Sequence, residues 1–125
     1  MKKRILLADD DPSVLELTKV RLEHVGFDVV TATDGQAAVE KAVDGTGIDL
    51  ILMDLRMPKL SGLEVCQQLK QNPSAMKIPV ILFSASSTSS HIFADRCVEL
   101  GIADWIRKPF QSKDLLEKIH RVLGP

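Results

Sequence analysis

Leu50-Ile51-Leu52-Met53-Asp54-Leu55-Arg56-Met57-Pro58 is the stretch that decides the fold, because a short apolar run ends in an acid and then in a proline. A run this short and apolar is typical of a strand buried on both faces of a parallel sheet. Such a strand tolerates a carboxylate only at its end or beside a partner, because burying an unpaired charge is very costly. We therefore place Asp54 at the carboxyl end of a buried strand.

Three other strand-like runs also end in polar residues. The run 5–8 leads into Asp9, Asp10 and Asp11, the run 80–83 leads to Ser84, and the run 103–107 leads to Lys108. In a parallel α/β sheet, ligands bind outside the carboxyl ends of the strands, where the order of winding reverses. We therefore expect acids, a hydroxyl and an ammonium to meet Asp54 in one crevice.

Strand-like and helix-like segments alternate along the whole chain. The predicted strands are residues 4–8, 28–32, 49–53, 79–84 and 103–107, and the predicted helices are 12–25, 35–44, 62–71, 89–100 and 112–123. Strict alternation predicts an α/β fold with a parallel sheet and helices on both of its faces. At 125 residues the chain has the size of one domain, which we expect to span residues 1–125.

The first and last helices carry the clearest signals. In the first, Asp11 can cap the helix, Pro12 suits its first turn and Gly26 ends it. Its predicted core stripe consists of Leu15, Thr18, Leu22 and Val25. The last helix is predicted to have Ser112 as its cap and a core stripe of Leu115, Leu116, Ile119, Val122 and Leu123.

Composition excludes several classes of function. The formal net charge is −1 and neither sign forms a long block, which argues against direct binding to nucleic acid or to a membrane surface. Cys66 and Cys97 belong to no CxxC or Cys/His cluster, so we expect reduced thiols in a cytoplasmic protein. The apolar run after Lys2, Lys3 and Arg4 is too short for a signal peptide or a membrane span.

The predicted crevice needs a bound cation. Carboxylates about 4 Å apart repel one another by about 4 kcal/mol per pair at an effective dielectric constant of about 20. Oxygen ligands with no nearby His or Cys favour a hard cation, and two carboxylates supplemented by water suit Mg²⁺ better than Ca²⁺. A metal, the Lys108 ammonium and the Ser84 hydroxyl around one carboxylate suit phosphoryl transfer, with Asp54 as a nucleophile that forms an acyl phosphate.

These residues resemble the receiver domain of bacterial response regulators, the CheY-like family, over the whole chain. That family has an acid pair after strand one, an acceptor aspartate in a D-x-x-M-P setting after strand three, Thr or Ser after strand four, and Lys-Pro after strand five. The matching residues here are Asp9 and Asp10, Asp54 with Met57-Pro58, Ser84 with Ala85, and Lys108-Pro109-Phe110. The resemblance implies a three-layer, doubly wound (βα)5 fold, flavodoxin-like, with strand order 2-1-3-4-5.

The resemblance also implies a role for each matched residue. Asp10, Asp54 and the backbone carbonyl of Arg56 would bind Mg²⁺ directly, and Asp9 would hold a metal-bound water. Ser84 and Lys108 would bind the phosphoryl oxygens, and the Lys108-Pro109 peptide would be cis. Ser84 and Trp105 would act as the switch, while Arg56 and Ser86 would tune the lifetime of the acyl phosphate.

By the same resemblance, the protein is a signalling switch of a two-component system or phosphorelay and not an enzyme acting on other molecules. A sensor histidine kinase or a histidine phosphotransfer protein would supply the phosphoryl group to Asp54, and hydrolysis would reset the switch. Phosphorylation would remodel the face made by helix four, strand five and helix five. The output would be a separate partner or a C-terminal effector domain, and the domain would be a monomer or a phosphorylation-promoted dimer.

The sequence departs from the family pattern in two places. Most members carry Tyr or Phe where Trp105 stands, so an inward-turning aromatic is less readily accommodated here. The segment from Ser84 to Lys108 is slightly longer than the common form, with the extra length in the serine-rich stretch 84–90, which could be a loop over the site.

Three alternative functions remain open at this point. Asp9-Asp10-Asp11-Pro12-Ser13 can be read as the D-x-D-x-S/T motif of a haloacid-dehalogenase-like phosphatase, with Asp9 as the nucleophile. A flavodoxin-like electron carrier has the same architecture, but the acidic turn after the first strand would repel its phosphate group. The third alternative is a receiver-like interaction module that is never phosphorylated.

Overall fold

The computed structural model describes residues 2–44, 47–84, 91–108 and 110–124. Within these ranges, five strands alternate with five helices. The strands are β1 (Arg4–Ala8), β2 (Asp28–Ala32), β3 (Leu50–Asp54), β4 (Val80–Ser84) and β5 (Asp104–Arg107). The helices are α1 (Pro12–His24), α2 (Gly35–Val43), α3 (Gly62–Lys70), α4 (His91–Glu99) and α5 (Ser112–Leu123). The predicted alternation is confirmed, with small shifts at the element ends; residues 89 and 90 of the predicted fourth helix lie outside the described ranges.

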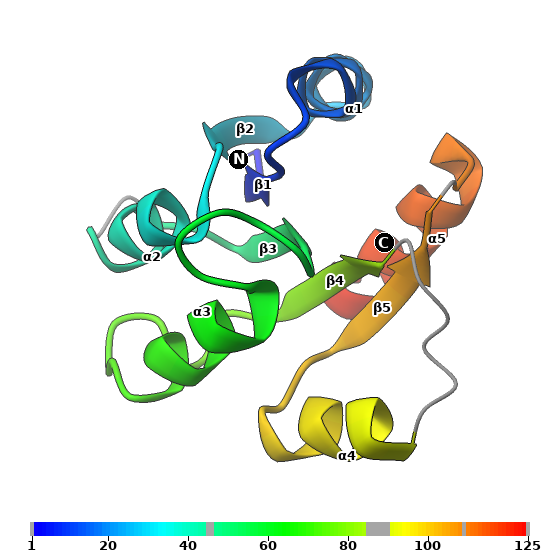
Figure 1. The fold of residues 1–125 in the computed structure, drawn as a ribbon. Helices are drawn as coiled ribbons and strands as arrows, with labels where there is room; N and C mark the ends of the chain where they lie inside the picture. Colours follow the sequence, from blue (N-terminus) through cyan, green and yellow to red (C-terminus); the bar gives the residue numbers. More distant parts are fainter. Residues whose placement is uncertain (1, 45–46, 85–90, 109, 125) are drawn as a thin grey trace.

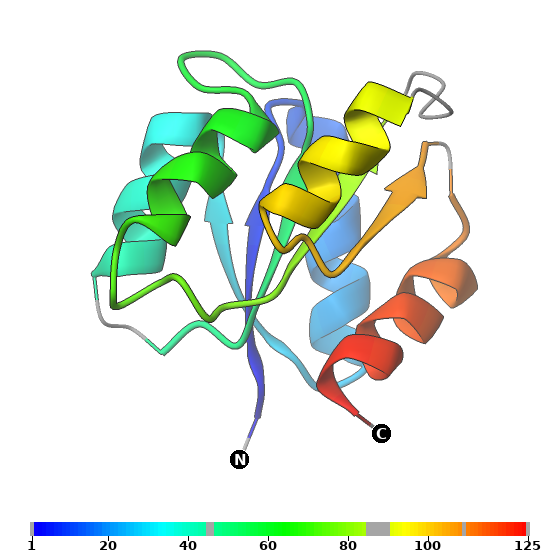
Figure 2. The same ribbon diagram turned by 90° about the horizontal axis from the view of Figure 1, so that it is seen from below.

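The strands form one parallel sheet in the order β2-β1-β3-β4-β5, as predicted. The chain winds from β1 out to β2 and then back across to β3, so the switch in winding direction lies between β1 and β3. Helices α1 and α5 cover one face of the sheet and α2, α3 and α4 cover the other (Figure 1). The predicted three-layer, doubly wound architecture is therefore confirmed, and Figure 2 shows the same arrangement from below.

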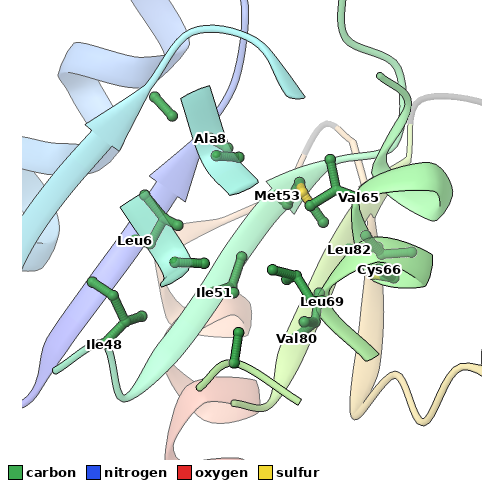
Figure 3. Packing of buried hydrophobic residues seen from close by; sticks show 14 residues of the cluster. Leu6, Ala8, Ile48, Ile51, Met53, Val65, Cys66, Leu69, Val80 and Leu82 are labelled. Carbon is green, nitrogen blue, oxygen red and sulfur yellow. The ribbon is translucent and has the colours of Figure 1, made fainter. Parts of the chain in front are cut away.

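Alternate residues of the central strands supply two separate cores. Leu6, Ile51 and Met53 belong to the core beneath α2 and α3, where Val65, Cys66 and Leu69 pack against the sheet (Figure 3). Ile5, Leu50 and Leu52 belong to the core on the α1 and α5 side. Strands buried on both faces explain why these runs are continuously apolar.

The ends of α1 agree with the sequence analysis except at one position. The Asp11 carboxylate accepts hydrogen bonds from the N–H groups of Ser13 and Val14 at 2.9 and 3.4 Å, and Gly26 ends the helix region with φ of 103°. Val25 was predicted to be part of the core stripe, but it is 50% exposed. The reason is that α1 ends at His24, so Val25 no longer follows the helical face.

The predicted cap of the last helix is wrong. Ser112 is the first residue of α5, the N-cap is Gln111, and no side chain caps the helix. The Ser112 hydroxyl instead accepts a hydrogen bond from the guanidinium of Arg21 on α1. The predicted apolar stripe of α5 is confirmed, because Leu115 and Ile119 are buried and its other members pack against the same core. In the described part of the chain, no helix has the length and apolar character needed to cross a bilayer.

Candidate functional site

The carboxyl ends of β1 and β3 bring three acids together. The two strands pair directly, with Ala8 opposite Met53, so the acids that follow them lie side by side. Carboxylate oxygens of Asp9, Asp10 and Asp54 all lie within 4.8 Å of one another. The predicted convergence of the acids at the point where the winding reverses is therefore confirmed.

The three acids differ in burial. Asp9 is only 1% exposed, and its Oδ1 accepts a hydrogen bond of 3.0 Å from the N–H of Asp11. Asp10 is exposed, whereas the Asp54 side chain is only 14% exposed. Asp9 thus forms the buried end of the cluster, and Asp10 forms the end that is open to solvent.

Lys108, which follows β5, reaches across the sheet end to two of these acids. Its Nζ donates to Asp9 Oδ2 at 2.8 Å and to Asp54 Oδ2 at 3.1 Å. The ammonium also lies 5.9 Å from the centre of the Phe83 ring, and that ring packs against Phe110 with centroids 5.0 Å apart. Aromatic rings and two carboxylates therefore hold the ammonium at the carboxyl end of the sheet.

The electrostatic environment shifts the pKa values of Asp54 and Lys108. Burial raises the pKa of the Asp54 carboxyl, and the charge of Asp9 adds to this effect, while the hydrogen bond and charge of Lys108 oppose it only in part. Burial would lower the pKa of Lys108, but its hydrogen bonds to Asp9 and Asp54 outweigh that effect and raise it. Lys108 is shared between two acids, so it keeps its proton without fully compensating Asp54.

The loop after β3 is tied down on both sides of the site. Leu55 N–H donates to the carbonyl of Phe83 at 2.8 Å, and Gly62 N–H donates to the carbonyl of Leu55 at 2.7 Å. Gly62 is required here, because a Cβ at this position would lie 2.8 Å from the Asp54 carbonyl oxygen and 3.1 Å from the Leu55 Cα. The absence of a side chain thus lets α3 begin directly against the strand that carries Asp54.

The remaining predicted site residues are placed only in part. The N–H of Arg56 donates to Asp54 Oδ1 at 3.3 Å, while the metal-binding role of its carbonyl stays a prediction. Ser84 ends β4 opposite Arg107, which is the expected strand end, but its side chain lies outside the description. Trp105 lies on the edge strand β5 and is 38% exposed. Ser86 and the predicted cis peptide to Pro109 lie outside the described residues.

The donor set of this cluster fits Mg²⁺. All the clustered ligand atoms are carboxylate oxygens, which hard divalent cations prefer, and no His or Cys belongs to this group among the described residues. Lys108 pairs with only two of the three acids, so the cluster keeps an excess of negative charge that a divalent cation would neutralise. Asp9, Asp10 and Asp54 are the side chains able to hold the ion.

Sequence reasoning missed the support given to Lys108. It assigned Lys108 to phosphoryl oxygens, but it did not foresee the contact with Asp9 or the Phe83 ring beneath the ammonium. Phe83 is the last apolar residue before Ser84, and this bulky side chain beside a polar strand end was the available signal.

Comparisons with known proteins identify the family. The sequence profile described as "Response regulator receiver domain" matches residues 5–120. The chain is 36% identical over 123 residues to the alkaline phosphatase synthesis transcriptional regulatory protein PhoP of Bacillus subtilis, with 98% of this chain and 49% of that protein covered.

Solved structures agree with this family. The chemotaxis response regulator CheY4 of Vibrio cholerae superposes with a TM-score of 0.89 at 27% identity, covering 98% of this chain and 100% of that one. The receiver domain of a sensor histidine kinase from Pseudomonas aeruginosa, described with a magnesium ion coordinated in its active site cleft, gives a TM-score of 0.87 at 27% identity with 100% of both chains covered.

The chain spans about half the length of the curated relatives it matches. The match nevertheless extends over nearly all of this chain, and it includes the strand ends that carry Asp9, Asp10, Asp54 and Lys108. The sequence and the structure agree on the sheet order and on the acidic cluster, and the comparisons agree on the fold. The chain belongs to the response regulator receiver domain family of two-component signal transduction.

Proposed function

We propose that Asp54 accepts a phosphoryl group from a phosphohistidine in a Mg²⁺-dependent reaction and that hydrolysis later removes it. The observation that carries this proposal is the position of the Asp54 carboxylate, which lies between two other acids and the Lys108 ammonium. Phosphoryl transfer depends mainly on positioning and on neutralising charge on oxygen. A carboxylate beside one fixed cation and a site for a second cation meets both requirements.

In the proposed reaction, an Asp54 oxygen forms a bond to phosphorus while the bond from phosphorus to the donor imidazole nitrogen breaks. The electron pair of that bond stays on the nitrogen that it leaves, and the imidazole departs as the neutral base because its other ring nitrogen already carries a proton. Lys108 neutralises a phosphoryl oxygen. To reach it, the Lys108 ammonium gives up its hydrogen bond to Asp54. A bound Mg²⁺ would neutralise the charge of the acids and of the phosphoryl oxygens.

Asp10, Asp54 and the Arg56 carbonyl are the proposed direct metal ligands, with Asp9 acting through a water. The burial of Asp9 and its contact with Lys108 support an indirect role, because its Oδ2 is already engaged by the ammonium. The exposure of Asp10 supports a direct role, since an ion can reach its carboxylate from solvent. Water attacking phosphorus would break the bond to the Asp54 oxygen and release inorganic phosphate.

The output of the switch is also part of this proposal. Ser84 would move toward the phosphoryl group, Trp105 would respond on the neighbouring strand, and the α4, β5 and α5 face would change. Trp105 of β5 pairs with Leu82 of β4, two residues before Ser84, so the two switch residues lie on neighbouring, hydrogen-bonded strands, which supports a mechanical link between them. Arg56 and Ser86 would set the lifetime of the acyl phosphate.

The donor would be a sensor histidine kinase or a histidine phosphotransfer protein in the cytoplasm. The relatives are about twice as long as this chain and several are described as transcriptional regulators, so a C-terminal effector region is the proposed context for residues 1–125 acting as one receiver domain. Direct contact with a separate partner is the alternative output, with the domain a monomer or a phosphorylation-promoted dimer.

The test is intact-mass measurement after incubation with a small acyl phosphate donor and Mg²⁺. The parent and the control Asp95→Asn, an exposed acid on α4, are expected to gain one phosphoryl group, whereas Asp54→Asn gains none. Chelation of Mg²⁺ should abolish the gain in the parent. Phosphorylation that persists in Asp54→Asn and disappears in Asp9→Asn would instead support the phosphatase-like alternative with Asp9 as nucleophile.

Trp105 fluorescence tests the switch separately. Mg²⁺ followed by beryllofluoride, a mimic of the acyl phosphate, is expected to change the emission of the parent and not of Asp54→Asn. Unchanged emission in a parent that is shown by mass to accept a phosphoryl group would refute the aromatic switch and leave the acceptor role intact.

A further inference from the structure

A pocket of about 570 Å³ is lined by residues of α1, of α5 and of the segment before α5. These two helices lie on the sheet face opposite α2 and α3 (Figure 1). The apolar wall of the pocket consists of Val14, Leu17, Leu22, Phe110, Leu115 and Leu116. The α1 residues of the wall follow helical spacing, so one continuous stripe of the helix faces the space. The volume falls in the range of about 300–1,000 Å³ that is typical of small-molecule sites.

The apolar wall is only partly covered by the protein itself. Leu17 is 56% exposed although it lines the pocket, whereas Leu115, which also lines it, is 3% exposed. The pocket thus has a buried apolar floor and an open apolar rim. A ligand with an aliphatic portion would remove this rim from water, which is favourable in proportion to the area covered.

Arg21 is the positive group of the pocket lining that has no acidic partner among the described residues. The Arg21 guanidinium donates to the Ser112 hydroxyl, and among the described residues it forms no ion pair with a carboxylate. A guanidinium offers five N–H donors in a planar fork, so one neutral hydroxyl leaves most of its capacity unused. Arg21 can therefore bind an anion that enters the pocket.

The other charged groups nearby do not compete for this role. Lys108 also lines the pocket, but its ammonium is engaged by Asp9 and Asp54. Asp114, the acid in the first turn of α5, lines a different pocket on the β5 side of the helix. The start of α5, which has no side-chain cap, adds a positive helix end beside Arg21.

We propose that this pocket binds a small amphipathic carboxylate, a medium-chain fatty acid in its chemistry, with the tail on the apolar wall and the carboxylate paired with Arg21. One guanidinium fork matches one carboxylate in a bidentate pair, whereas a doubly charged phosphate monoester would require more positive charge than the pocket offers. The site is distinct from the acid cluster, although the two share Lys108 as a boundary. The proposal does not depend on phosphorylation of Asp54.

The test is a titration of the ¹⁵N-labelled protein with octanoate, followed by NMR, at concentrations below those at which octanoate aggregates. Saturable shifts are expected at amides of residues 14–22 and 110–116. Arg21 is exposed, so octan-1-ol, which lacks the charge, is expected to bind about threefold more weakly. Arg21→Gln should weaken octanoate binding by about threefold on the same basis. Leu17→Asn should weaken it by about threefold, because part of the apolar rim is lost.

The matched control is Arg121→Gln. Arg121 is also an arginine of α5 but lines the other pocket, so this variant should bind octanoate as tightly as the parent does. The spectrum of each variant without ligand verifies that it is folded. The proposal is overturned if octanoate causes no saturable shift, if the shifts lie outside these segments, or if octan-1-ol and octanoate bind equally and Arg21→Gln has no effect.

Discussion

Replacing Asp54 by Asn is expected to stabilise the metal-free protein at neutral pH. The carboxylate oxygens of Asp9, Asp10 and Asp54 lie within 4.8 Å of one another, while one ammonium, that of Lys108, lies 3.1 Å from Asp54. Asn has nearly the same shape as Asp and removes the negative charge. The substitution therefore measures the net electrostatic cost of keeping an ionised carboxylate in this cluster.

The expected gain in the free energy of unfolding is about 1–2 kcal/mol. At an effective dielectric constant of about 20 and at the upper limit of 4.8 Å for the separation, each of the two neighbouring acids repels Asp54 by about 3.5 kcal/mol. On the same scale, Lys108 at 3.1 Å attracts Asp54 by about 5 kcal/mol. The repulsion therefore exceeds the attraction by about 2 kcal/mol, and solvent around the exposed Asp10 reduces that difference.

The pH dependence has a definite sign. Burial and the neighbouring acid raise the pKa of Asp54 in the folded protein, so the folded state binds its proton more tightly than the unfolded state does. Asp54 thus stabilises the folded protein at pH values below its ordinary pKa of 3.8. This contribution is lost as the pH rises through the raised pKa of the folded state. The advantage of Asp54→Asn should accordingly be complete at pH 7 and should vanish near pH 3.

Urea unfolding of the two proteins, in buffer containing a chelator and then in Mg²⁺, provides the assay. Mg²⁺ at ten times its dissociation constant should stabilise the parent by about 1.4 kcal/mol and Asp54→Asn by much less. Asp95→Asn is the control, because it removes an exposed charge far from the cluster in sequence. A variant that is less stable than the parent at pH 7 without metal would show that Lys108 outweighs the acids and would refute this reasoning.

Three more substitutions, at Lys108, Gly62 and Cys66, have expected effects on stability. Lys108→Gln should destabilise the metal-free protein by about 3 kcal/mol, because it leaves the buried Asp9 without its cation. In urea unfolding, Mg²⁺ should restore part of this lost stability. An equal loss of stability with and without Mg²⁺ would contradict the prediction. Gly62→Ala should cost about 1–3 kcal/mol in the same assay, because the new Cβ lies 2.8 Å from the Asp54 carbonyl oxygen, while Gln67→Ala on the exposed side of α3 should have little effect. Burial raises the pKa of Cys66 from 9.0 to about 12, so the thiol ionises first in the unfolded state and the free energy of unfolding falls above pH 9. Between pH 8 and 10 the parent should lose about 1.4 kcal/mol more of that free energy than Cys66→Ala does. Equal losses in the two proteins would exclude this effect.

Local sequence was sufficient for the elements and for the identity of the acids. The apolar runs before Asp9 and Asp54 can be satisfied only by burial on both faces, so both the strands and the polar residues at their ends could be predicted. The Asp11 cap was also predictable, because a cap bonds N–H groups two and three residues away. Ser112 was misassigned because a serine beside a helix start can be either the cap or the first helical residue, and here its hydroxyl is taken by Arg21 of another helix.

Contacts between distant segments could not be read from the chain. Lys108 bonds Asp9 across a separation of 99 residues. The strand ends predicted that its ammonium would meet Asp54, but they did not predict its bond to Asp9 or its position over Phe83. The pocket between α1 and α5 depends on how closely two helices approach over one sheet, and both helices show an ordinary apolar stripe in sequence. Hydrophobic pattern fixes which side of each element is buried, because that choice is local, whereas the distances between side chains on different elements depend on packing of the whole fold.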